Sequence, residues 1–165
     1  MKILLSWIAF NNDLKEDEDT GQLRGPTLQI LREQSFDVLH LFSNDTYSQE
    51  KASALKRHVH MNEENEFDVK EIEVEFLSLR SPADYKSLWD KLPKKVGQIL
   101  SKYDKNENKI FINLSAGTPA MTSTWMMMVG TGELKATLLN PQIDKSTKLE
   151  SIDIVDAGIY PFVRE

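Results

Sequence analysis

Short apolar runs alternate with longer amphipathic stretches along this chain. The apolar or alternating runs predict β-strands at residues 2–9, 36–42, 69–77, 109–114, 136–139 and 151–155. Helical spacing of apolar positions predicts helices at residues 26–33, 49–61, 83–103 and 120–129. Strands that alternate with helices are typical of βαβ units, which carry parallel sheets. The pattern therefore predicts an α/β fold, a three-layer sandwich with a mostly parallel central sheet.

Two of the expected strands differ in their predicted exposure. Residues 71–77 alternate acidic with apolar side chains, which predicts one solvent-facing surface and a place near a sheet edge. Residues 110–114 are almost continuously apolar, as in a central strand that is buried on both faces. Ligands of open α/β sheets bind at the carboxyl ends of central strands, so the loop that begins at Ser115 is a candidate binding site.

Two polar stretches, residues 11–24 and 140–149, are expected to be loops and mobile surface excursions, and the first is acidic in its middle. The chain has no Gly/Ser linker and no internal repeat, so residues 1–165 are interpreted as a single domain. Apolar Ile159, Tyr160 and Phe162 lie close to the last residue. We expect them to pack on this domain or on a following one.

Composition and charge narrow the possible functions. The 165 residues are 40% hydrophobic and 28% charged, as in an ordinary soluble protein, and no run approaches the ~20 apolar residues that span a bilayer. Cysteine is absent, which removes thiol nucleophiles and disulfides and agrees with a cytoplasmic location. The net charge of −6 argues against broad binding to duplex nucleic acid, and no membrane contact is expected.

The turn after the central strand has the chemistry of an anion site. Ser115, Ala116, Gly117 and Thr118 follow the strand directly, and Pro119 suits the first turn of a helix. Gly117 permits a tight turn, and a hydroxyl from Ser115 or Thr118 can cap the helix. Such a turn offers hydroxyls, backbone amides and the positive end of a helix dipole to a phosphate. A well-capped turn without any ligand fits the same residues.

Other familiar sites have no counterpart in the sequence. The phosphate-binding motifs G-x-x-x-x-G-K-[ST] and G-x-G-x-x-G after a strand are absent, which disfavours a nucleotide triphosphatase and a dinucleotide dehydrogenase. His40 lies in an apolar strand and is interpreted as a core histidine, and His58 and His60 do not share a helix face. We therefore assign no catalytic residue, no metal ligand and no cofactor.

Residues 113–121 read Asn-Leu-Ser-Ala-Gly-Thr-Pro-Ala-Met. This segment resembles the signature of CRISPR-associated Rossmann fold (CARF) domains, in which a strand ends in Asn-x-Ser-Gly-Gly-Thr-x-x-Met. Ala116 replaces the first glycine of the signature, a mild departure that limits positive φ angles at that position. A looser similarity covers the whole chain and includes residues 25–27 and 140–141. The resemblance implies a Rossmann-like fold.

The resemblance also implies a function. CARF domains form symmetric homodimers that bind a cyclic oligoadenylate second messenger or a related RNA-derived ligand, and they control an attached effector in type III CRISPR antiviral signalling. Members include Csm6-like ribonucleases and RNA-repair sigma-54 activators. The chain is thus expected to be the N-terminal sensor of a longer effector protein, with cyclic tetra-adenylate as the favoured ligand. Two alternatives stay open: a ring nuclease that cleaves the messenger, and a sensor of RNA ends in an RNA-repair activator.

Carried over by position, the resemblance assigns ligand contacts to the signature and to the loop after the first strand. The residues expected to line the phosphates and sugars are Ser115, Ala116, Gly117, Thr118 and Met121. The residues expected to form a second wall are Phe10, Asn11 and Asn12, with Ser43 and Asn44 as further candidates at the end of the second strand. Trp7 can stack on a base, but an aromatic residue in an apolar strand is more often part of the core.

Overall fold

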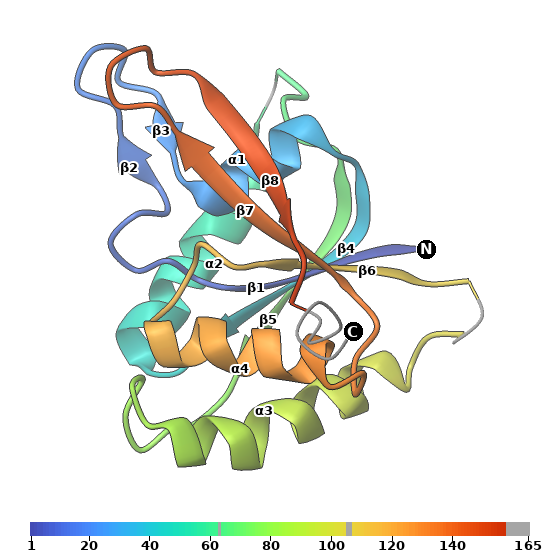
Figure 1. Ribbon diagram of the computed structural model, residues 1–165. Helices are drawn as coiled ribbons and strands as arrows, with labels where there is room; N and C mark the ends of the chain where they lie inside the picture. Colours follow the sequence, from blue (N-terminus) through green and yellow to red (C-terminus); the bar gives the residue numbers. More distant parts are fainter. Residues whose placement is uncertain (63, 105–106, 158–165) are drawn as a thin grey trace, which may run out of the picture.

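The computed structural model describes residues 1–62, 64–104 and 107–157 (Figure 1). Its main sheet comprises β1 (Lys2–Trp7), β4 (Phe36–Ser43), β5 (Val69–Phe76), β6 (Lys109–Asn113), β7 (Thr137–Ile143) and β8 (Glu150–Val155). The helices are α1 (Pro26–Glu33), α2 (Thr46–His60), α3 (Tyr85–Leu100) and α4 (Pro119–Gly130). A small second sheet pairs β2 (Lys15–Glu16) with β3 (Leu23–Arg24).

The strand order of the main sheet is β5-β4-β1-β6-β7-β8. Strands β5, β4, β1, β6 and β7 run parallel, and β8 is antiparallel to β7. Helices α3 and α4 cover one face of the sheet, and α1 and α2 cover the other (Figure 1). The mostly parallel, Rossmann-like three-layer fold predicted from the alternation of strands and helices is confirmed.

Alternate residues of β1 belong to the two apolar cores, one on each face of the sheet. Ile3, Leu5 and Trp7 are buried with α3 and α4, whereas Leu4 and Ile8 are buried with α1 and α2. This two-sided burial explains why β1 reads as a continuous apolar run. The prediction for the third strand is also confirmed, because β5 is the edge strand of the sheet and exposes most of its acidic side chains.

The structure corrects both expected loops. Residues 140–149 are not one loop: β7 extends to Ile143, and Asn140 and Pro141 pair with Asp153 and Ile152 of β8. Polar side chains on an exposed edge hairpin give the sequence the composition of a loop. Residues 11–24 include the β2–β3 ladder and the fully buried Asp13, so the segment is not simply a surface excursion.

His40 is a core histidine, as predicted. It is buried, with Nδ1 3.0 Å from Glu75 Oε1 and Nε2 2.8 Å from the Tyr103 hydroxyl. Burial lowers its pKa, because the charged imidazolium loses its hydration. In the described ranges no cluster of three or more His, Asp or Glu residues could hold a metal, and none of the helices there combines the length and hydrophobicity of a bilayer-spanning segment. Residues 158–165, including Ile159, Tyr160 and Phe162, lie outside the described residues.

The end of α4 makes a close contact that leads to a prediction. A Cβ at Gly130 would lie 2.5 Å from the carbonyl oxygen of Ala157, whereas a Cβ at Gly97 in α3 would meet nothing within 4 Å. We expect Gly97→Ala to raise the free energy of unfolding by about 0.5–1 kcal/mol through helix propensity, and Gly130→Ala to lower it by about 1–3 kcal/mol through overpacking. Urea denaturation of the two variants checks this, and equal stabilisation by both would show that Ala157 does not pack over α4.

Candidate functional site

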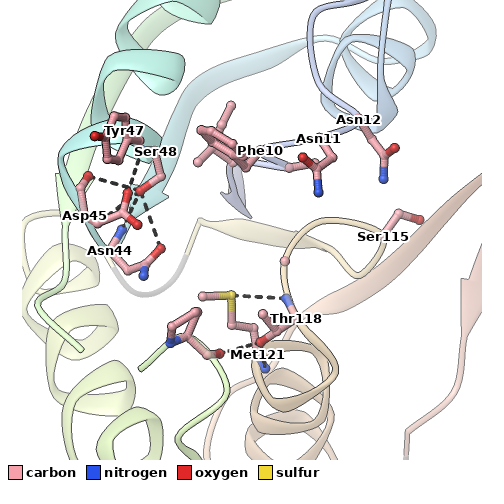
Figure 2. Close-up of a pocket in the computed structure, with 14 residues that line it drawn as sticks. Phe10, Asn11, Asn12, Asn44, Asp45, Tyr47, Ser48, Ser115, Thr118 and Met121 are labelled. Carbon is pink, nitrogen blue, oxygen red and sulfur yellow. Dashed lines mark hydrogen bonds between the residues drawn. The ribbon is translucent and has the colours of Figure 1, made fainter. Parts of the chain in front are cut away.

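A cavity of about 370 Å³ lies at the carboxyl ends of β4, β1 and β6 (Figure 2). These strands are neighbours and parallel, so the loops that follow them meet at one edge of the sheet. The cavity is lined by Ile8, Ala9, Phe10, Asn11, Asn12, Asn44, Asp45, Tyr47, Ser48, Pro82, Ser115, Gly117, Thr118 and Met121. The strand order therefore brings together segments that are far apart in the sequence.

Asn113, the last residue of β6, fixes the turn that leads into the cavity. Its buried amide donates from Nδ2 to Ser6 Oγ at 3.1 Å, and its Oδ1 accepts the backbone N–H of Ser115 at 3.0 Å. The Ser115 hydroxyl lies 2.7 Å from Asn140 Oδ1 and 2.9 Å from the carbonyl oxygen of Pro141. The loop after β6 is thus held from β1 on one side and from β7 on the other.

Gly117 and Thr118 form the start of α4. Gly117 is exposed with φ of 98°, and a Cβ there would lie 2.7 Å from Met121 Sδ. Thr118 is the N-cap: its Oγ1 accepts the N–H of Met121 at 3.3 Å, and the same hydroxyl donates to the carbonyl oxygen of Pro82. The first turn of α4 contains no acidic residue. The positive end of this helix therefore faces the cavity with no carboxylate in its own first turn to offset it.

The buried Asp13 side chain stabilises the loop after β1, residues 10–12, through hydrogen bonds. The Asp13 carboxylate accepts the backbone N–H groups of Ala9 at 2.9 Å and Thr27 at 3.1 Å, and the Thr27 hydroxyl at 2.8 Å. Burial outweighs these bonds and raises the pKa of Asp13 to about 6. Sequence reasoning missed this residue, because nothing in the local pattern separates it from the exposed acids that follow it.

A third wall comes from the start of α2, which the sequence analysis placed too late. The Asp45 side chain accepts the N–H of Ser48 at 2.7 Å, and Ser48 Oγ accepts the N–H of Asp45 at 3.1 Å, a reciprocal capping box. This cap starts the helix at Thr46 and puts Tyr47 on the cavity rim. The spacing of Asp45 and Ser48 was the available signal for these residues.

The structure brings most of the expected ligand-contacting residues to the cavity, namely Phe10, Asn11, Asn12, Asn44, Ser115, Gly117, Thr118 and Met121. Ala116 and Ser43 are not among the lining residues. Both are fully buried: Ala116 packs into the core under α3 and α4, and Ser43 Oγ donates to the carbonyl oxygen of Glu75 at 3.4 Å. Trp7 is also a core residue, with its ring centroid 5.5 Å from that of Phe42.

The cavity has little positive side-chain charge. The lining residues in the described part of the chain include no lysine, arginine or histidine. A second cavity of about 660 Å³ adjoins it and shares Asn12 and Ser115. Its lining includes both basic and acidic residues, namely Lys15, Arg24, Lys145 and Lys148 with Glu16, Asp17, Glu18 and Glu150. Arg24 there is paired with Asp17 at 3.1 Å and with Glu150 at 2.9 Å. An anion in the first cavity would therefore rely on backbone amides and hydroxyls.

Comparison with solved structures finds proteins of the same fold. Enterococcus italicus Csm6 bound to cyclic hexa-2'-fluoro-hexa-dAMP matches 95% of this chain with 23% sequence identity and a TM-score of 0.66. Can2 from Sulfobacillus thermosulfidooxidans in complex with cyclic tetra-adenylate matches 92% with 9% identity and a TM-score of 0.57. The chain spans 35% of the Csm6 chain and 36% of the Can2 chain.

At the level of sequence, no protein-family model matches the chain, and no curated protein matches it either. The identities to Csm6 and Can2 are low, so these comparisons bear on the fold. The resemblance of residues 113–121 to a family signature predicted this same Rossmann-like fold. The chain therefore shares the Rossmann-like fold of the matching parts of Csm6 and Can2.

Proposed function

We propose that this chain is a regulatory ligand-binding domain that senses a cyclic oligoadenylate, with cyclic tetra-adenylate favoured, and controls an attached effector in type III CRISPR antiviral signalling in the cytoplasm. The observation that carries the proposal is the exposed Gly117 turn on the wall of a cavity at the carboxyl end of the sheet. The solved structures of Csm6 and Can2, which share the fold, hold cyclic adenylate ligands.

The phosphates of the ligand would lie against the start of α4. The Gly117 backbone N–H, at the positive end of a helix of 12 residues, makes no hydrogen bond to any described residue and can donate to a phosphate, whereas the hydroxyls and N–H groups of Ser115 and Thr118 already have protein partners. Glycine at position 117 lets the ligand backbone approach the main chain closely. This arrangement suits a phosphate in a chain whose net charge is −6, because the attraction is local and does not depend on the overall field.

The proposal includes a homodimer and a longer protein. A ring with an even number of repeats has two-fold symmetry, so it can contact the same loop of each protomer across a two-fold axis. An attached C-terminal effector agrees with the lengths of Csm6 and Can2, of which this chain spans about a third. Light scattering after gel filtration is expected to give the mass of a dimer, and a monomer that persists with saturating ligand would contradict this part.

Calorimetric titration of the purified chain with cyclic tetra-adenylate and cyclic hexa-adenylate tests the ligand. We expect saturable binding of at least one ring, and no comparable binding of linear tetra-adenylate or of RNA that ends in a cyclic phosphate. Absence of binding by both rings would overturn the proposal, and preference for the RNA end would favour the repair sensor. Chromatography of the ring after incubation is expected to return it intact, and linear products would identify a ring nuclease.

A further inference from the structure

The cavity has two chemically different walls. The α4 wall consists of Ser115, Gly117, Thr118 and Met121, and it carries hydroxyls and a helix N-terminus without an acid in its first turn. The α2 wall combines Phe10, from the loop after β1, with Asn44, Asp45, Tyr47 and Ser48 at the start of α2, and it carries aromatic rings, an amide and a carboxylate. Figure 2 shows Phe10 and Tyr47 across the cavity from Thr118 and Met121. A nucleotide also has two unlike ends, an anionic phosphate and a flat, neutral base.

The aromatic rings of the α2 wall are exposed although they are large. Phe10 is 52% exposed and Tyr47 is 71% exposed, while Trp7 and Phe42 nearby in the fold are fully buried. Covering such apolar ring surface with a ligand would be favourable. Stacking on a nucleobase covers such rings and contributes substantially to the binding of single-stranded nucleic acids.

Polar residues line the same cavity. Asn44, directly after β4, lines the same cavity, and the Asp45 carboxylate accepts only the N–H of Ser48 among the described hydrogen bonds. The side-chain amides of Asn11 and Asn12 make no hydrogen bond to any described residue. Amides pair with the N6 and N7 positions of adenine, and a carboxylate can accept a hydrogen bond from its amino group. The negative charge of Asp45 is unfavourable for a phosphate. A nucleotide is therefore expected to place its base at the α2 wall and its phosphate at the α4 wall.

We propose that the α2 wall is the base-binding side of the cavity, where an adenine of the ligand packs against Phe10 and Tyr47 while its phosphate lies at Gly117 and Thr118. This inference rests on the proposed function and adds the orientation of the ligand to it. It also assigns Tyr47, which no part of the signature contains, to ligand recognition.

The test compares single variants by calorimetric titration with cyclic tetra-adenylate and with its all-uridine counterpart. Phe10→Leu and Tyr47→Leu keep apolar bulk but remove the flat ring. Each is expected to weaken binding of the adenylate ring by about tenfold or more, because stacking on a base is lost. Tyr85→Leu is the matched control: Tyr85 is 46% exposed at the start of α3 and does not line the cavity. It is expected to bind like the wild type.

The outcomes separate the inference from the proposed function. If the wild type binds neither adenylate ring, the proposed function fails. If the wild type binds but Phe10→Leu and Tyr47→Leu both match Tyr85→Leu, the proposed function stands and the base-binding wall is wrong. Tighter binding of the all-uridine ring by the wild type would also overturn the inference, because uracil stacks more weakly than adenine. Circular dichroism of each variant verifies that it is folded.

Discussion

Gly117→Ala is expected to lower the affinity for cyclic tetra-adenylate by about 100-fold or more, equivalent to about 2.7 kcal/mol. Two effects combine at this position. The backbone has φ of 98°, which an L side chain rarely adopts, and the added Cβ would lie 2.7 Å from Met121 Sδ and 3.2 Å from Met121 Cβ. Met121 is buried and caps the turn, so its displacement changes the α4 wall directly. Calorimetric titration measures the loss.

Gly132→Ala is the matched control for this variant. Gly132 also has a positive φ, 81°, but a Cβ there would meet nothing within 4 Å and the residue does not line the cavity. We expect Gly132→Ala to cost about 1–2 kcal/mol of stability through backbone strain and to leave the affinity unchanged. Wild-type affinity in folded Gly117→Ala would contradict a role for this turn in binding.

Asp13 is expected to make the protein less stable as the pH rises through the acidic range. Its pKa is about 6 in the folded state, above the ordinary value of 3.8 that holds in the unfolded chain. The folded state therefore binds the proton more tightly, and the stability that Asp13 contributes is complete below pH 3.8 and is lost as the pH rises through 6. Between pH 4 and pH 7 this contribution falls by about 2–3 kcal/mol.

Asp13→Asn isolates the effect, because the amide has the same shape and does not titrate. Other carboxyls have lowered pKa values, such as Asp144 at about 2, and they change stability mainly at lower pH. Urea denaturation at pH 4 and pH 7 should show that the free energy of unfolding of the wild type decreases by about 2–3 kcal/mol more than that of the variant. Parallel changes in the two proteins would show that Asp13 is not a buried titrating group.

Several features of the site were readable from the sequence because they depend on local order. The motif in residues 113–121 includes its own glycine, its cap and the apolar strand before it, and these residues form one turn in the structure. Asn11 and Asn12, in the loop after β1, were likewise expected at the binding site, and both line the cavity. The motif did not reveal that the side chain of Ala116 points into the core, because the direction of a side chain in a turn depends on how the turn packs.

Periodicity and residue type by themselves determined the order of the main-sheet strands and the helices, the edge position of β5, the central position of β6 and the turn that starts α4, but not β2 and β3. These properties follow from the exposure of each short segment, which its own residues encode. Only the tertiary structure decided that Asp13 is buried beneath the loop after β1 and that Tyr47 stands on the cavity rim. It also decided that residues 140–143, expected to belong to a loop, continue β7 and pair with β8. The burial of Asp13 and the place of Tyr47 beside the loops after β1 and β6 depend on contacts with other segments of the chain, and the length of the β7–β8 ladder depends on the pairing of two strands, which neither strand encodes alone.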